Sequence, residues 1–209
     1  MSVLNRLASS LGRRDEIPNQ ALARDLVARN DQAGIREAVE NLWNKDKSIQ
    51  ADCIKVLYEV GAIEPGLIAG YADDFVELLR SRNNRLVWGG MTALAEAAKA
   101  NPQAVFKHLD EIKKAKEAGS VITVDNAIST LAYIAAANAQ YNKAIFPYLL
   151  KHLAGCRPKE VPQHSERTLP AVNSSNKVDF TKVLEKRLAD LSGSGLARLK
   201  KVIKQTASL

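Results

Sequence analysis

Apolar residues recur along this chain with two nested spacings. The shorter one follows the i, i+3, i+4, i+7 pattern of an amphipathic helix, as between Ile35 and Leu42. The longer one is a period of 37 residues, which separates Leu57 from Leu94 and Leu94 from Leu131. A repeat of this length predicts stacked helical hairpins, in which each unit buries its apolar face against the next. No segment alternates between apolar and polar residues as a strand would. We therefore predict an all-α fold, a short α-solenoid.

The period and the turn signals divide the chain into consecutive parts. We interpret residues 1–209 as one α-solenoid domain, with N-terminal capping helices in 1–34 that include an opening helix over 1–14. Repeats fill residues 35–154, and an irregular segment containing three prolines covers 155–178, because an interior proline breaks a helix. Basic helices occupy 179–207. The expected first helices of the hairpins are 35–42, 68–79 and 105–116, and the second helices are 48–60, 85–98 and 123–137.

The residues around these helices resemble HEAT repeats. The segments that carry the likeness are 42–57, 78–87, 93–97 and 127–132. The arginine that often follows the first apolar residue of the second helix is replaced by Gln50, Val87 and Val124, which leaves HEAT, armadillo and a looser helical array as alternatives. In size and basicity the chain also has a weak likeness to HEAT-like DNA alkylation-repair glycosylases.

The amino-acid composition limits the class of protein and its expected cellular location. With 46% apolar and 25% charged residues the chain has the composition of a folded globular protein, and it lacks the roughly 18-residue apolar run of a membrane span. Two cysteines favour a reducing, cytoplasmic location. The opening segment, 1–14, is amphipathic and lacks acidic residues, so a mitochondrial targeting peptide is the alternative to a first helix. The net charge of +7 is concentrated in 177–209, where eight basic residues face three acidic ones.

One face of each second helix is polar where the opposite face is buried. In HEAT repeats this helix lines the concave surface, so the resemblance implies a stripe that contacts a partner. A merely solvated face is the alternative interpretation. The predicted partner-binding stripe consists of Asp52, Lys55, Glu59, Arg85, Thr92, Glu96, Asn126, Ser129 and Tyr133.

Basic residues also recur in the turns between the first and second helices. Stacking would place these turns along one edge, so we predict a positive rim that attracts an anionic partner. Lysine and arginine also commonly occupy helix C-termini without binding anything. The basic edge consists of Lys45, Lys47, Arg80, Arg82, Lys113, Lys114, Lys116, Arg157 and Lys159.

No residue pattern indicates catalysis. The nucleotide-binding, serine-hydrolase and metal motifs are missing from the sequence, and the histidines show no metal spacing. We therefore expect no catalytic residue, no cofactor and no metal. Trp43 and Cys53 are interpreted as packing residues, and the helical pair Gly89–Gly90 as a close helix crossing, with approach of a ligand to Gly89 as the alternative.

These observations favour a non-enzymatic binding or scaffold module that presents its concave helical surface to a protein or peptide. The alternative function is DNA binding, or removal of alkylated bases by a HEAT-like glycosylase, which would make a nucleic acid the partner. In that class of enzyme an aspartate on the concave surface is catalytic, and Asp52 is the nearest candidate.

Overall fold

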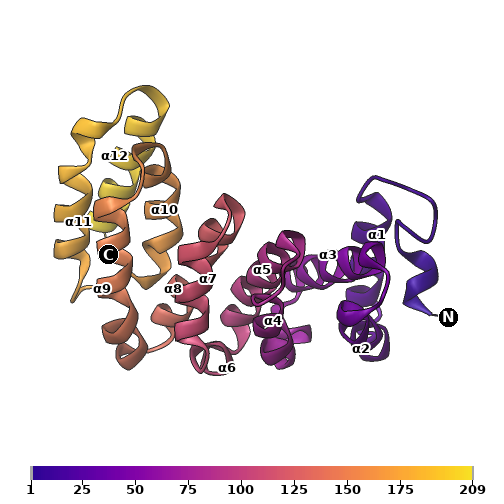
Figure 1. Ribbon diagram of the computed structural model, residues 1–209. Coiled ribbons are helices and arrows are strands. Elements are labelled where there is room, and N and C mark those ends of the chain that lie inside the picture. Colours follow the sequence, from indigo (N-terminus) through magenta and orange to yellow (C-terminus); the bar gives the residue numbers. More distant parts are fainter. Residues whose placement is uncertain (1, 209) are drawn as a thin grey trace. The chain divides into compact units, whose positions relative to one another are not determined.

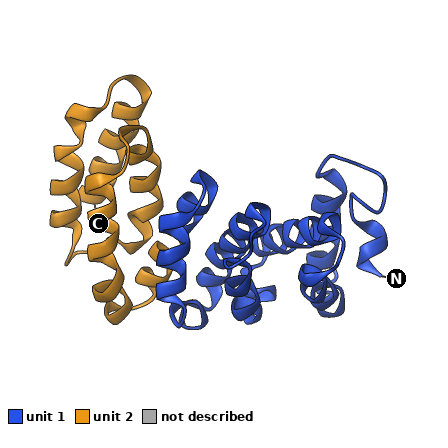
Figure 2. Cartoon of the chain, in the orientation of Figure 1, with its two compact units in different colours: residues 1–127 blue, residues 128–209 orange. Residues whose placement is uncertain are grey.

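The computed structural model describes residues 2–208, and within that range it contains helices and no strand. Two compact units divide the chain, residues 1–127 and residues 128–209, coloured blue and orange in Figure 2. The helices of the two units are labelled in Figure 1. In the span 2–208, no helix is long and apolar enough to cross a lipid bilayer. The all-α solenoid expected from the sequence is confirmed.

The first unit begins with short elements and continues through long helices. In order these are η1 (Val3–Arg6), α1 (Ile17–Ala28), α2 (Gln32–Glu40), η2 (Asn41–Trp43), α3 (Lys47–Ile63), η3 (Pro65–Leu67), η4 (Ala69–Tyr71), α4 (Ala72–Leu78), α5 (Asn84–Ala100), α6 (Pro102–Phe106), α7 (Leu109–Ala118) and the first turns of α8 (Val121–Ala137). The long helices α1, α3 and α5 pack successively against one another, while α2 packs on α3 and α4 packs on α5.

Burial confirms the leucines that define the period. Leu57 in α3, Leu94 in α5 and Leu131 in α8 each have a relative exposure of 0%. Each such side chain removes a full isobutyl group from water, which stabilises the folded state by about 1.5–3 kcal/mol. The sequence period is therefore the period of the core.

The first helices of the second and third repeats depart from the prediction, because each is broken into two pieces. In the second repeat the 3₁₀ turns η3 and η4 precede α4, and Gly70 lies within η4. In the third, α6 ends at Phe106 and α7 starts at Leu109. In these two repeats, short elements precede a second helix and a long third helix, an arrangement similar to the three helices of an armadillo repeat.

The opening segment is also different from the prediction. An α-helix is expected over 1–14, but the structure has only the 3₁₀ helix η1 followed by turns. Val3 and Leu7 are buried, as their spacing suggests, whereas Leu11 is 54% exposed. Gly12 adopts a positive φ of 66°, a conformation that suits glycine and stops a helix. Met1 lies outside the described residues.

The second unit starts within α8 and is built around α9 (Ala139–Gly155), which packs against α10 and α11. The other elements are η5 (Pro158–Glu160), α10 (Val161–Thr168), η6 (Leu169–Ala171), α11 (Lys177–Lys186), η7 (Leu188–Asp190) and α12 (Gly193–Ala207). The two basic C-terminal helices are thus observed. The segment 155–178, expected to be irregular, contains α10, because Pro158, Pro162 and Pro170 all lie in first helical turns, where proline is tolerated.

Gly89 and Gly90 mark the crossing of α5 with its neighbours. A Cβ on Gly90 would lie 2.9 Å from the carbonyl oxygen of Phe75, and one on Gly89 would lie 2.8 Å from Ile54 Cγ1. Both glycines are buried. Close packing therefore explains the pair, and approach of a ligand to Gly89 is wrong because Ile54 fills that space.

Candidate binding surfaces

Asp52, the first residue of the predicted stripe, anchors the N-terminal segment to α3. Its Oδ2 accepts a hydrogen bond from the backbone N–H of Ser9 at 2.8 Å, and its Oδ1 accepts one from Asn19 Nδ2 at 2.7 Å. The residue is buried. Both carboxylate oxygens are thus used within the chain, so a base or peptide reaching Asp52 would have to displace these donors.

Lys55 lies one turn further along α3 and is buried by the same segment. Its Nζ is 2.7 Å from Glu16 Oε2 and 2.6 Å from Glu59 Oε1, and it lies 4.9 Å from the ring centroid of Tyr58. Burial disfavours the charge on Lys55, but the two carboxylates outweigh that effect and raise its pKa. Glu16 also approaches Arg85, at 3.6 Å, so one carboxylate links α3 and α5.

Two further hydrogen bonds involve the polar stripe. In the first unit, Asn126 Nδ2 donates to Thr92 Oγ1 at 2.8 Å. In the second unit, Arg167 Nη1 donates to Ser129 Oγ at 2.7 Å. These contacts join side chains more than thirty residues apart in the sequence, so this part of the stripe forms links within the protein.

The remaining stripe residues are less enclosed. Glu96 forms an ion pair with Lys99 on the same helix, and Tyr133 is half-buried. The predicted stripe residues lie on the long helices α3, α5 and α8. Several of them hold the repeats together, and that is a different task from binding a partner.

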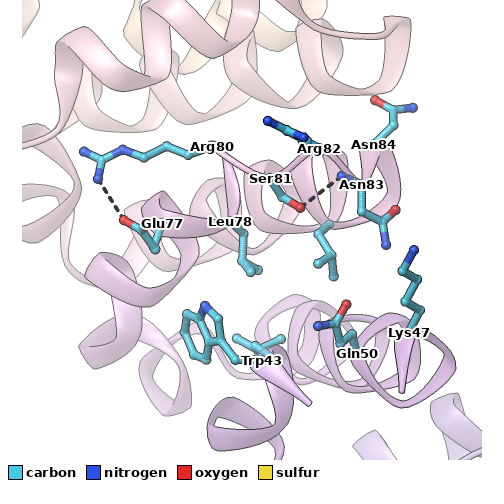
Figure 3. Close-up of a pocket in the computed structure, with 12 residues that line it drawn as sticks. Trp43, Lys47, Gln50, Glu77, Leu78, Arg80, Ser81, Arg82, Asn83 and Asn84 are labelled. Carbon is cyan, nitrogen blue, oxygen red and sulfur yellow. Dashed lines mark hydrogen bonds and ion pairs between the residues drawn. The ribbon is translucent and has the colours of Figure 1, made fainter. Parts of the chain in front are cut away.

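The basic edge lies beside a groove in the first unit. A cavity of about 660 Å³ is bordered on one side by Trp43 and Lys47, next to α3, and on the other by Leu78, Arg82 and Asn83, between α4 and α5 (Figure 3). Trp43 is 49% exposed, so its interpretation as a core packing residue is wrong. An exposed indole at the rim of a groove is available for contact with a partner.

Two smaller cavities lie next to the first and share lining residues with it. One of about 300 Å³ shares Lys47 and Asn83 with the first and also involves Arg14. Another, of about 240 Å³, shares Ser81 and Arg82 with it. These three cavities share lining residues within residues 1–127, and we call them together the edge groove. Their lining also includes the carboxylates of Glu77, Asp15, Glu16 and Asp52.

The edge groove follows the amino-terminal ends of α3 and α5. Lys47 is the first residue of α3, whose cap Asp46 accepts a hydrogen bond from the N–H of Ser48 at 2.7 Å. Asn83 caps α5 in the same way, accepting from the N–H of Arg85 at 3.0 Å. These caps occupy backbone donors at both helix ends, and the one on α3 is itself a carboxylate, so the positive charge at this edge comes from the side chains.

Within the described range, Lys47 and Arg82 have no hydrogen-bond or ion-pair partner, and both are exposed. Arg80, in contrast, pairs with Glu77 at 2.8 Å and approaches Glu111 at 3.7 Å. Residues 1–127 carry 17 basic and 18 acidic residues, so their net charge is −1 and the positive character of the groove is local.

The other members of the predicted edge lie at the surface. Lys45 and Lys114 are exposed, and Lys113 and Lys116 are half-buried on α7. Two more members, Arg157 and Lys159, belong to the second unit. Arg157 caps η5 through an ion pair with Glu160, and this contact lowers the pKa of Glu160.

The second unit is strongly basic. Residues 128–209 contain thirteen Lys or Arg and five Asp or Glu, a net charge of +8. Exposed lysines of α12 include Lys200, Lys201 and Lys204, and those of α11 include Lys182 and Lys186. The basic C-terminal end seen in the sequence therefore becomes an exposed surface of two adjacent helices.

Three possible metal ligands that the sequence analysis treated separately meet in this unit. Ligand atoms of His152, Cys156 and His164 all lie within 4.8 Å of one another. The statement that these histidines lack a partner at metal spacing is therefore wrong. His152 and Cys156 are four residues apart on one helix, a spacing that could have indicated a shared face. The fold of α10 back onto α9, which supplies His164, could not be read from the sequence.

Two other residues with potentially reactive side chains, Cys53 and His108, lie in the first unit. Cys53 is fully buried, and burial raises the pKa of its thiol to about 12, which agrees with its prediction as a packing residue. The third histidine, His108, has its Nε2 2.6 Å from Asp73 Oδ1 on α4.

The fold is that of an armadillo/HEAT-like α-solenoid, with a groove in the first unit lined by both basic and acidic residues. No family model matches the sequence, and no curated protein sequence is significantly similar to it. Solved structures do match. An engineered protein of the Northeast Structural Genomics Consortium has a TM-score of 0.68 at 21% identity, covering 100% of this chain and 98% of that one.

A designed armadillo repeat protein in complex with the peptide (KR)4 matches with a TM-score of 0.67 and 16% identity, over 99% of both chains. Kap121p bound to Pho4p matches with a TM-score of 0.62 and 14% identity; the match covers 99% of this chain and 23% of Kap121p. At these identities the comparisons establish the fold, a helical-repeat scaffold of the kind predicted.

Proposed function

We propose that this chain is a non-enzymatic binding scaffold whose edge groove holds an extended acidic segment of a partner protein. The observation that carries the proposal is the groove itself, which exposed Trp43 lines at one end, Lys47 at the other end of the same wall and Arg82 on the opposite wall (Figure 3). An aromatic anchor flanked by cations suits a peptide with carboxylates around an apolar side chain.

The similar structures support a peptide or protein as the partner. The designed armadillo protein is in complex with a peptide, and Kap121p is bound to Pho4p. The peptide (KR)4 is basic, whereas the edge groove of this chain presents cations. We therefore assign the opposite charge to the partner of this chain, on the same fold.

A labelled acidic peptide with one central tryptophan or leucine tests this proposal by fluorescence anisotropy. Binding should weaken as salt rises, because exposed charges are screened within about 8–10 Å at physiological ionic strength. Trp43→Ala should weaken binding about 30-fold, the effect of losing roughly 2 kcal/mol at an aromatic anchor. Lys47→Glu combined with Arg82→Glu should abolish it.

Lys107→Glu is the matched control, because Lys107 is an exposed lysine of the same unit that does not line the groove. It should leave binding unchanged. Equal affinity of the acidic peptide for the wild type and for the Lys47/Arg82 double variant would refute the proposal.

Nucleic-acid binding is the second candidate function, and the observation favouring it is the net charge of +8 on residues 128–209. Such binding should fall steeply with salt through counterion release. It should be lost in Lys200→Glu/Lys201→Glu and retained in the groove double variant. The glycosylase alternative gains no support from Asp52, both of whose carboxylate oxygens accept hydrogen bonds from the chain.

A further inference from the structure

We propose that His152, Cys156 and His164 form a zinc-binding site in the second unit. Two imidazoles and a thiolate are typical ligands of Zn²⁺. Ca²⁺ and Mg²⁺ prefer oxygen ligands, so they do not fit this set. The site is independent of the edge groove, which belongs to residues 1–127.

The geometry is close to that of a metal site. His152 Nε2 and His164 Nδ1 are 2.9 Å apart, and all three ligand atoms lie within 4.8 Å of one another. Bond lengths of about 2.0–2.1 Å to nitrogen and 2.3 Å to sulfur place tetrahedral ligand atoms roughly 3.3–3.6 Å apart. Shifts of about an ångström or less would bring the three atoms to those separations. A metal bound here would take the place of the hydrogen bond between the two imidazoles.

The protein framework holds the three side chains without help from a metal. His152 and Cys156 are on the last turn and C-cap of α9, four residues apart, so they project from the same side. Pro158 starts η5, which turns the chain so that α10 packs on α9 and presents His164.

Arg187 fixes the end of α9 from a third helix. Located at the C-cap of α11, it donates from Nη1 to the carbonyl of Leu153 at 2.5 Å and from Nη2 to the carbonyl of Cys156 at 2.8 Å. These bonds satisfy carbonyls that a helix end leaves free. They also fix the position of the Cys156 backbone, which limits the positions that its thiol can occupy.

Exposure distinguishes the three ligands. His164 is only 1% exposed, while His152 and Cys156 are half-buried. The cluster therefore has one closed side and one side open to solvent, where a water molecule would complete a tetrahedron. Bound in this way, Zn²⁺ would tie α9 to α10 across the proline turn.

The test uses the full chain after removal of metal with a chelator. Titration with Co²⁺, a spectroscopic substitute for Zn²⁺, should give a thiolate-to-cobalt charge-transfer band and the intense visible bands of tetrahedral cobalt at one equivalent. Zn²⁺ should then displace the cobalt stoichiometrically. It should also raise the melting temperature of the protein, because a ligand that binds only the native state stabilises it.

Cys156→Ser should remove the charge-transfer band and weaken Zn²⁺ affinity at least about 100-fold, since the serine hydroxyl remains protonated where the thiolate binds. His152→Gln supplies a second ligand variant, with circular dichroism confirming its fold. His108→Gln is the control, because His108 is outside the cluster, and it should bind like the wild type.

Absence of the thiolate band in the wild type would overturn the proposal. So would Zn²⁺ binding that Cys156→Ser leaves unchanged, because the metal would then be held elsewhere. Equal weakening of Zn²⁺ binding by His108→Gln and His152→Gln would also overturn the proposal.

Discussion

Asp52→Asn tests whether the N-terminal segment is held to the solenoid by one carboxylate. The substitution keeps the size of the side chain and removes its charge. One of the two acceptors becomes an NH₂ group, which must then face either the N–H of Ser9 or the amide of Asn19. One hydrogen bond to a charged acceptor is lost, worth about 1.5–3 kcal/mol, and a largely buried donor is left unsatisfied.

The expected loss in the free energy of unfolding is therefore about 2–4 kcal/mol. Urea unfolding followed by circular dichroism measures it, provided that the slope with denaturant is unchanged. Hydrogen exchange should show faster exchange of the Ser9 amide, which the carboxylate protects in the native state. Glu185→Gln is the control at an exposed carboxylate of α11 and should change stability by less than about 0.5 kcal/mol.

A double-mutant cycle with Asn19→Ala isolates the contact between the two side chains. Because Asn19 Nδ2 lies 2.7 Å from Asp52 Oδ1, the two changes should couple by about 0.5–3 kcal/mol. A destabilisation by Asp52→Asn of less than 0.5 kcal/mol, with the Ser9 amide still protected, would refute the view that this carboxylate anchors the segment.

Three other predictions concern the core. Leu94→Ala should lower the free energy of unfolding, measured with urea, by about 2–5 kcal/mol. Val178→Ala, at a side chain that is 58% exposed, should lower it little. Similar losses in the two variants would contradict the repeat assignment. Gly90→Ala should destabilise the protein, because the new Cβ would lie 2.9 Å from the carbonyl oxygen of Phe75. Gly155→Ala should not, because there is open space around Gly155. Cys53 should resist alkylation at pH 8 in the native state, since a pKa of about 12 keeps the thiol protonated at that pH; rapid labelling detected by mass spectrometry would show that it is accessible.

The sequence predicted the fold well where periodicity determines it. Leu57, Leu94 and Leu131 are equivalent core residues because a 37-residue unit must bury the same face in every layer. The helical spacing of apolar residues, which located the repeats, led to a wrong prediction for the opening segment. Val3 and Leu7 have helical spacing, but a 3₁₀ turn buries them equally well, and Gly12 ends the segment.

Surface properties were harder to predict than the core. The stripe on the long helices was predicted from helical periodicity, and the sequence could not show that Asp52 and Thr92 use their polar atoms within the chain. Those contacts join residues some thirty to forty positions apart, and their partners depend on how helices pack. Trp43 was interpreted as a packing residue, and only the three-dimensional arrangement places it at the rim of the edge groove.

The caps on α3 and α5 have a consequence for selectivity at the edge groove. Asp46 and Asn83 already accept the first backbone N–H groups of those helices, the donors that phosphate-binding loops commonly use. An anion arriving there must be recognised by long, mobile side chains. Such contacts tolerate varied carboxylate spacings, so the groove would accept a range of related acidic sequences in preference to one ligand of fixed shape.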